Sequence, residues 1–415
     1  MYTRIMCIVD CRIFLQDRLS DMLTSFNVLT PGNIRFGRGL ARSAAPWLAG
    51  RSAQILLVHG ASLTRAEFLL SELHARQLHV TTLSIAHEPS LQDIERGVRL
   101  AREKGIGAVV SLGGGAVIDA GKAIAALVPA QGPAIEYLEV VGTGRLLEAN
   151  PLPFVAIPTT AGTGAEVTKN AVINVPEQQR KVSLRDDRML PDLAIVDPSL
   201  TDNAPRAVTL ASGLDAITQV IEPWLCARAN PFTDALCREA IPRGIKALRT
   251  LMVKECPDSR DEMAWVSLCG GLALANAGLG VIHGLAGPLG GLSNAAHGAL
   301  CGSLLPFGLA LNETQVSDEK IRQPIHDQRH RLPPPHHLDP HTPAHPHPHS
   351  PPHQHPKQKN HHHNHPPNTH HQHTHHQNPN NQHQPQHPKQ PNQPHTTQTP
   401  PTIPKPPKPP PHHTK

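Results

Sequence analysis

Short apolar runs alternate with longer amphipathic segments between residues 53 and 204. The runs are rich in Val, Ile and Leu and predict buried strands, whereas the longer segments carry apolar residues at helical spacing. Strands that alternate with helices are typical of βαβ units, so the sequence predicts an α/β domain with a parallel sheet. The predicted strands are Gln54–Val58, Val80–Ser84, Ala108–Leu112, Phe154–Ile157 and Leu193–Val196, and the predicted helices are Leu63–Arg76, Leu91–Lys104 and Val117–Val128.

The pattern changes after Pro205, where strand signals stop and helical spacing continues, broken by Pro223 and Pro231. We therefore divide the chain into an N-terminal extension (1–25), an α/β domain (26–204), an all-α helical domain (205–314) and a tail (315–415). The remaining predicted elements are a hairpin of Ala171–Val175 with Lys181–Leu184, and the helices Ala207–Glu222, Thr233–Leu251, Glu262–Asn276 and Gly278–Leu292.

Composition separates the tail from the rest of the chain. After Asn312 lie 24 of the 30 His and 26 of the 44 Pro, whereas all seven Phe, three Trp and two Tyr lie before it. Residues 1–312 hold 28 Lys and Arg against 28 Asp and Glu, so the formal charge of +5 belongs to the tail. A neutral body gives no electrostatic reason to expect nucleic-acid binding.

The tail itself has almost no apolar side chains. From Pro351 to Lys415 every residue except Ile403 is Pro, His, Gln, Asn, Lys or Thr, so this segment cannot bury a core. It is open to interpretation as a His-rich metal-buffering tract or as a disordered extension. The third interpretation is that the tail results from a frameshift or a misread gene end. It fits the residue types best, because codons made only of A and C encode these six residue types. We assign the tail no function.

Cysteine usage and hydropathy bear on the compartment. The seven cysteines are scattered and form no CxxC pair, which is typical of free thiols in a reducing environment. No run of ~18 apolar residues predicts a membrane span. Asp10 and Arg12 interrupt the apolar stretch near the N-terminus, so we expect neither a signal peptide nor a membrane partner. The expected location is cytoplasmic.

Two loops directly after predicted strands carry candidate chemistry. Residues 113–119 read GGGAVID and join a strand to a helix, where glycines and free N–H groups favour an approaching phosphate. Residues 158–168 read PTTAGTGAEVT and follow the next strand, so their hydroxyls can donate to phosphate or ribose oxygens. Each loop alone is explained equally well as an ordinary tight or Ser/Thr-capped turn.

Four residues of the helical region form a third candidate. Asp215 and Gln219 stand four residues apart and so share one helix face. His283 and His297 are two of only six His before Asn312. A carboxylate with two imidazoles is a suitable set for a divalent metal, although each His alone is more often an ordinary core or surface residue.

Taken in order along the chain, these motifs resemble the iron-containing (group III) alcohol dehydrogenases. The similarity runs from about Phe26 to Asn312 and includes the segments FNVLTPGNIRFGRG, SLGGGAVIDAGKAIAAL, AIPTTAGTGAEVT, MLPDLAIVDPSLT and GLDAITQVIE. The resemblance implies that the α/β domain binds a dinucleotide and that the helical domain holds a divalent metal, Fe²⁺ or Zn²⁺. The implied metal ligands are Asp215, Gln219, His283 and His297. The implied cofactor residues are Gly60, Gly113, Gly114, Gly115, Ala116, Asp119, Thr159, Thr160, Thr163, Thr168, Lys181 and Leu200.

The chain departs from the family pattern at several positions. Gln219 stands where the family usually has a histidine, and a carboxamide is a weaker, neutral ligand. Gly287 stands where many members have a further histidine, so we name no general base. Ala116 replaces a common serine. The tail replaces the helices with which the family continues, which leaves an incomplete helical domain and predicts an exposed apolar face.

The resemblance implies an oxidoreductase that transfers a hydride between NAD(P) and a small alcohol or aldehyde, with the metal as Lewis acid. The segment after the first predicted strand, residues 58–62, lacks the acid with which NAD-preferring members hold the ribose, and Arg65 follows; this favours NADP slightly. A maleylacetate-reductase-like oxoacid reductase and an inactive truncated product are the alternatives. The sequence does not determine the oligomeric state, but dimers are common in the family, so the resemblance suggests a homodimer.

Overall fold

A computed structural model describes residues 25–293 and 295–315. The predictions for the N-terminal extension up to residue 24 and for the tail from residue 316 lie outside the described residues.

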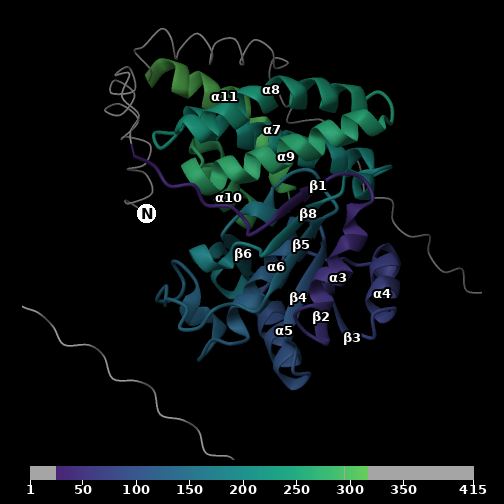
Figure 1. Ribbon diagram of the computed structural model, residues 1–415. Helices are drawn as coiled ribbons and strands as arrows, with labels where there is room; N and C mark the ends of the chain where they lie inside the picture. Colours follow the sequence, from purple (N-terminus) through teal and green to yellow (C-terminus); the bar gives the residue numbers. More distant parts are fainter. Residues whose placement is uncertain (1–24, 294, 316–415) are drawn as a thin grey trace, which may run out of the picture. The chain divides into compact units, whose positions relative to one another are not determined.

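Six parallel strands form one sheet in the order β1-β8-β5-β4-β2-β3. This confirms the predicted α/β class. The four strands β2, β4, β5 and β8 are covered on both faces and read as continuous apolar runs, and the edge strand β3 is rich in β-branched residues, so the pattern predicts all strands but one. The exception is β1, a three-residue edge strand beside β8 (Figure 1). The strands are β1 (Ile34–Phe36), β2 (Gln54–His59), β3 (His79–Ser84), β4 (Ala108–Gly113), β5 (Phe154–Pro158) and β8 (Leu193–Val196).

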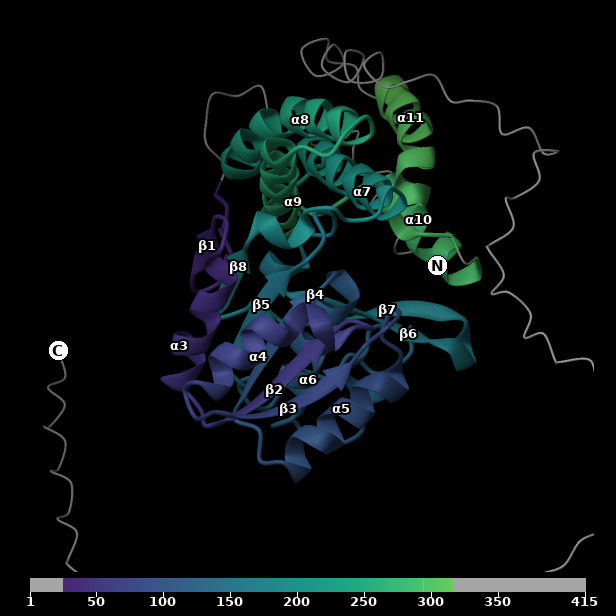
Figure 2. The same ribbon diagram turned by 90° about the vertical axis from the view of Figure 1, so that its right-hand side faces the viewer.

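Helices cover both faces of this sheet (Figures 1 and 2). Consecutive side chains of β2 point to opposite faces: Ile55 and Leu57 join the buried cluster beneath α3 and α4, whereas Leu56 and Val58 join the cluster beneath α5 and α6. The predicted helix Leu63–Arg76 begins later than expected, because Leu63–Ala66 forms a tighter 3₁₀ turn. The helices are α3 (Ala44–Ala49), α4 (Glu67–His74), α5 (Leu91–Glu103) and α6 (Gly115–Leu127).

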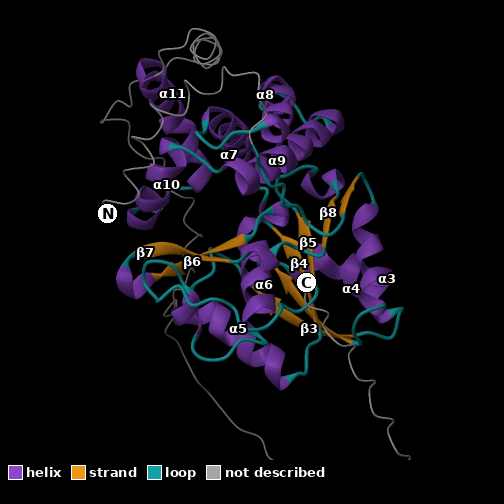
Figure 3. Ribbon diagram, turned by 60° about the vertical axis from the view of Figure 1, so that its left-hand side comes forward, coloured by secondary structure: helices purple, strands orange, loops and turns teal. Residues whose placement is uncertain are grey.

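The predicted hairpin forms a second, two-stranded sheet (Figure 3). Its strands, β6 (Asn170–Val175) and β7 (Arg180–Arg185), pair antiparallel with Ala171 opposite Leu184. β6 packs against α6, and β7 lies against α10. The hairpin therefore lies between the sheet and the helical region.

The described chain after residue 204 contains helices and no strand, as predicted. α7 packs against α8, α9 and α11. Among the described residues, no single helix is long and apolar enough to cross a membrane, and α9 with α10 meets that test only as a pair bent by 102°. The helices are α7 (Arg206–Leu225), α8 (Pro231–Leu251), α9 (Pro257–Ala277), α10 (Val281–Leu292) and α11 (His297–Gln315).

The pattern did not predict α11 as a helix, because glycines interrupt its apolar spacing. The same glycines let α11 approach α7 closely. A Cβ at Gly298 would collide with the main-chain carbonyl of Ala211, and one at Gly302 would lie 2.5 Å from a methyl carbon of Leu214. Small residues are therefore needed at both positions.

Large apolar side chains on α10 and α11 are exposed, as the sequence led us to expect. Leu292 and Phe307 are 75% and 62% exposed, respectively. Other exposed apolar side chains on these helices are Leu285, Leu289 and Leu311. Apolar surface of this kind favours association.

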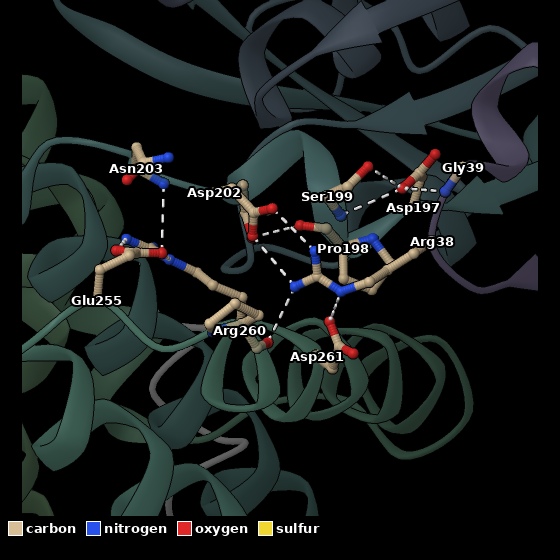
Figure 4. A network of polar contacts seen from close by, with 12 residues as sticks. Arg38, Gly39, Asp197, Pro198, Ser199, Asp202, Asn203, Glu255, Arg260 and Asp261 are labelled. Carbon is tan, nitrogen blue, oxygen red and sulfur yellow. Dashed lines mark hydrogen bonds and ion pairs between the residues drawn. The ribbon is translucent and has the colours of Figure 1, made fainter.

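A polar network joins the sheet to the helical region (Figure 4). The buried carboxylate of Asp197, which follows β8, accepts the N–H groups of Gly39 and Ala41 after β1, each at 3.0 Å. Arg38 donates to Asp202 and to Asp261 of α9, each at 2.8 Å. The carboxyl ends of two strands are thereby fastened to α9.

We expect Asp197→Ala to lower the free energy of unfolding by about 2–3 kcal/mol, because it leaves buried N–H groups without an acceptor. Urea denaturation of the full chain measures this. Asp187→Ala is the control, since that carboxylate is exposed and forms an ion pair with Lys169; it should cost less than about 1 kcal/mol. Equal losses in the two variants would contradict the assigned role of Asp197.

Candidate functional site

The loops singled out in the sequence meet at the carboxyl edge of the sheet. Gly60 follows β2, residues 113–116 comprise the last residue of β4 and the three that follow it, and residues 159–163 follow β5. These three strands are parallel neighbours, so their loops lie side by side. β2 has β3 on one side and β4 on the other, so strand order reverses between β2 and β4. Ligands of open α/β sheets bind outside the carboxyl ends of the strands at such a point.

The glycine-rich loop (residues 113–116) is in direct contact with the Thr-rich loop (residues 159–163). The Thr159 N–H donates to the Gly113 carbonyl at 2.9 Å. A Cβ at Gly115 would lie 2.7 Å from Thr163 Oγ1, so that position is closed to larger residues. A Cβ at Gly114, the N-cap of α6, would meet Thr160 at an acceptable 3.4 Å. The N-terminus of α6 therefore presents its N–H groups beside the hydroxyl-bearing loop, as anion binding requires.

Asp119 and Thr168 lie in a buried charge cluster beneath this edge. Lys122 Nζ donates to Thr168 Oγ1 at 3.0 Å and lies 3.8 Å from Asp119. Asp119 also accepts the Val172 N–H of β6 at 3.0 Å. Burial raises the pKa of Asp119 to about 6 and that of Glu166 to about 7, and it lowers the pKa of Lys122 to about 8. These contacts hold α6 to the hairpin.

Two further predicted residues, Lys181 and Leu200, lie outside the three loops described above. Lys181 on β7 forms an ion pair of 2.5 Å with Glu88, and its Nζ lies 3.4 Å from where a Cβ at Gly290 of α10 would be. Leu200 follows β8 and packs, partly buried, against the core cluster on the α3 and α4 side of the sheet. Leu200 extends the row of loops by one strand, whereas Lys181 faces the helical region.

Asp215, His283 and His297 come together from three different helices. Asp215 Oδ1 lies 3.3 Å from His283 Nε2 and 3.8 Å from His297 Nε2. Together with Cys301 Sγ, the ligand atoms of these residues all lie within 4.8 Å of one another. Sequence reasoning missed Cys301 by treating all cysteines as scattered. Its position four residues after His297, on the same face of α11, was the available signal.

Glu222 is a second residue that sequence reasoning missed. Its buried carboxylate lies 2.5 Å from His283 Nδ1 and accepts the Ile282 N–H at 2.7 Å. Because Nδ1 is held in this way, Nε2 of the same ring faces Asp215. Glu222 stands seven residues after Asp215, two helical turns along the same face of α7, which is the signal that could have found it.

Gln219 is placed differently from the other predicted metal ligands. Its Nε2 donates to the Thr163 carbonyl at 2.6 Å, and the side chain is buried. The hydrogen bond joins α7, one turn after Asp215, to the Thr-rich loop. The amide therefore connects the helix that carries Asp215 to the carboxyl edge of the sheet. We call Asp215, His283 and His297, together with Cys301, the imidazole cluster.

The two carboxylates make the cluster favour positive charge. Burial alone would lower the pKa of His283, but hydrogen bonds, first that to Asp215, outweigh burial and raise it well above its ordinary value. His297 is likewise raised despite burial, mainly by its contact with Cys301. Burial would raise the pKa of Cys301, but its contacts with the two imidazoles lower it.

A divalent cation fits this set of side chains. Carboxylate and imidazole ligands bind Zn²⁺ at ~2.0–2.2 Å, which at tetrahedral angles separates ligand atoms by ~3.3–3.5 Å. The 3.3 Å between Asp215 and His283 matches that spacing, and the 3.8 Å to His297 is slightly wider. On α10, an added Cβ at the exposed Gly284 or at Gly287, one turn after His283, would meet no heavy atom within 4 Å.

Comparison with known proteins covers most of the described chain. The family model "Iron-containing alcohol dehydrogenase" matches residues 31–198, and the model of the C-terminal domain of the same family matches residues 209–326. The second match reaches past Asn312, where we had placed the end of the resemblance.

Two relatives show how far the similarity extends. A long-chain-alcohol dehydrogenase of Geobacillus thermodenitrificans is 39% identical over 231 residues, which are 55% of this chain and 58% of that protein. An NAD-dependent methanol dehydrogenase of Bacillus methanolicus is 32% identical over 294 residues, 69% of this chain and 76% of that protein. The chain thus spans less than two thirds of the first relative's length.

A solved structure of a 1,3-propanediol oxidoreductase has the same fold. It superposes with a TM-score of 0.66 at 27% identity and covers 74% of this chain and 85% of its own. With both domain models matched in order, and with more than two thirds of a 32% identical relative covered, the chain belongs to the iron-containing alcohol dehydrogenase family.

Proposed function

We propose that this protein transfers a hydride between NAD(P) and a small alcohol or aldehyde, using a divalent metal held by Asp215, His283 and His297. When bound, the metal supplies Lewis-acid stabilisation to the alcohol or carbonyl oxygen. The nicotinamide ring carries the hydride.

The observation that carries this proposal is the contact between the two parts of the site. Asp215 belongs to the imidazole cluster, and Gln219, one turn further along α7, donates to the loop carbonyl of Thr163. Thr163 in turn lies against Gly115 at the N-terminus of α6. A dinucleotide at that edge and an alcohol beside the metal would therefore be neighbours, as hydride transfer requires.

We assign the cofactor residues to two roles. The loops after β2, β4, β5 and β8 would contact the dinucleotide, through backbone N–H groups at the α6 N-terminus and through threonine hydroxyls. Asp119 and Thr168 would position those loops through Lys122, and Lys181 would reach the cofactor from β7. The loop residues are Gly60, Gly113, Gly114, Gly115, Ala116, Thr159, Thr160, Thr163 and Leu200.

The substrate is proposed by class only. The named substrates of the relatives range from methanol to long-chain alcohols, so a panel of primary alcohols of increasing length is the appropriate assay. Gly287 lies one turn after His283, and an added Cβ there would meet no heavy atom within 4 Å, so we propose this position as the place for the alcohol. The proposed setting is a cytoplasmic homodimer, on the grounds of sequence and family resemblance.

The first test is catalytic. Asp215→Asn should lower kcat/KM for alcohol oxidation by roughly 100-fold or more, because several kcal/mol of charge stabilisation depend on the bound metal. Rates of dinucleotide reduction by the full chain with added Zn²⁺ or Fe²⁺ measure this. Asp258→Asn, at an exposed position on α9, should leave the rate unchanged. A fully active Asp215→Asn variant would contradict the proposal.

The second test concerns Glu222. Glu222→Gln should weaken Zn²⁺ binding by about 10–100-fold, the usual cost of removing the partner that orients a metal-bound histidine. Competition with a chromophoric chelator measures this loss. Zn²⁺ binding by the histidines of the tail is the same in the unaltered chain and in the variant, so it does not affect the comparison. The exposed Glu177→Gln is the control. Unchanged affinity in Glu222→Gln would show that His283 does not need this carboxylate.

A third test addresses the glycine loop. Gly114→Ala should raise the Kd of NAD(P)H by roughly 10–100-fold, because the added methyl group keeps a phosphate from one or two N–H groups. The thermal midpoint should hardly change, since the protein itself has room for this Cβ. NAD(P)H fluorescence measures binding, and Gly50→Ala, at another open position, is the control. A variant that binds as well as the unaltered chain would exclude the loop as the phosphate site.

The fourth test distinguishes the two cofactors. Arg65 is exposed just after β2 and is the charged group we assign to a 2′-phosphate. Arg65→Ala should raise KM for NADPH by about tenfold, the loss of one charge-assisted contact, and leave KM for NADH nearly constant. Equal effects on the two cofactors would remove the basis for the NADP preference.

A further inference from the structure

We propose that Cys301 is a thiolate ligand of the metal, forming a four-residue set with Asp215, His283 and His297. This inference rests on the proposed function, because it names a further ligand of the same metal. It also predicts which metal the site prefers.

The position of the sulfur supports this assignment. Cys301 is fully buried and lies one turn after His297, and its Sγ is 3.6 Å from His297 Nε2. A metal bound to sulfur at ~2.3 Å and to imidazole at ~2.0–2.1 Å places those two atoms ~3.5 Å apart at a tetrahedral angle. The observed spacing is therefore that of two ligands of one ion.

The backbone of α11 holds the sulfur in this position. Gly298 and Gly302 flank Cys301 on either side and bring the helix against α7. At this close approach, Cys301 Sγ lies within 4.8 Å of the Asp215 carboxylate on the facing helix. The thiol thus occupies its position because of main-chain packing, which leaves it little freedom to move elsewhere.

Gln219 is already engaged elsewhere. Its amide donates to the Thr163 carbonyl at 2.6 Å, and a Cβ at Gly270 would touch it at 3.4 Å, so it is enclosed as well as bonded. Only the amide oxygen Oε1 then remains as a donor atom for a metal. It would be a neutral oxygen ligand, weaker than a thiolate.

A thiolate changes the charge and softness of the site. Asp215 and Cys301 together bring two negative charges, which balance a divalent ion, and the thiol proton is released to solvent when the Cys301–metal bond forms. Soft sulfur ligands favour Zn²⁺ or Co²⁺ over hard ions such as Mg²⁺ and Mn²⁺. We therefore expect the chain to retain zinc when purified.

The test is titration of the metal-free full chain with Co²⁺, followed by absorption spectroscopy. A thiolate bound to Co²⁺ gives a charge-transfer band in the near ultraviolet, and tetrahedral Co²⁺ gives intense visible bands. No cysteine follows Cys301, so the His-rich tail cannot produce the thiolate band. We expect the band in the unaltered chain and its loss in Cys301→Ser, with Co²⁺ affinity lowered by at least ~10–100-fold.

Cys256→Ser is the matched control, because Cys256 is the N-cap of α9 and serine is a good N-cap residue. It should keep the band. A band that persists in Cys301→Ser would overturn the inference, since the thiolate would then be another cysteine.

His283→Ala separates this inference from the proposed function. Visible bands that disappear in His283→Ala, with no thiolate band in the unaltered chain, would show a metal site without Cys301 and overturn only the inference. A Co²⁺ spectrum that His283→Ala leaves unchanged would overturn both the inference and the proposed metal site.

Discussion

The close packing of α11 against α7 is the constraint on which the site depends. Gly298 lies against the main chain of Ala211, and Gly302 lies against Leu214. Any larger side chain at these positions would push the two helices apart. His297 would then leave the neighbourhood of Asp215, even though neither residue itself had changed.

α7 connects the loops at the carboxyl edge of the sheet with the cluster of Asp215, His283 and His297. Along one face it carries Asp215, Gln219 and Glu222. The first belongs to the cluster of possible metal ligands, the second donates to the Thr-rich loop, and the third holds His283. A shift of α7 would therefore disturb the cluster and the loop together. Reactions that need two bound groups in contact depend on such rigid spacing.

Much of the fold follows from local pattern. Continuous apolar runs predict β2, β4, β5 and β8, because each is buried on both faces, and β-branched residues predict the edge strand β3. The hydrophobic pattern failed to predict elements whose formation depends on tertiary contacts. β1 has only three residues and exists as a strand because β8 offers it a partner. In α11, the glycines that helix packing requires interrupt the regular spacing of apolar residues that would have predicted a helix.

The candidate site was predictable to a similar degree. Asp215, His283 and His297 could be named from the sequence because motif order indicated a family. Sequence could not show that the Asp119 carboxylate turns inward to the Val172 N–H, or that the Gln219 amide faces a loop carbonyl. Such choices depend on which partner lies within ~3 Å, and that is decided by the packing of distant segments.

The central claim is that one divalent ion binds between α7, α10 and α11, next to a dinucleotide at the carboxyl edge of the sheet. The most direct measurement is anomalous X-ray diffraction at the zinc edge, from crystals of the full chain grown with Zn²⁺ and NAD(P)H. The account predicts a zinc peak bonded to Asp215, His283 and His297, with the nicotinamide ring beside it. Zinc found only at other histidines, with these three side chains bonded to one another, would contradict it.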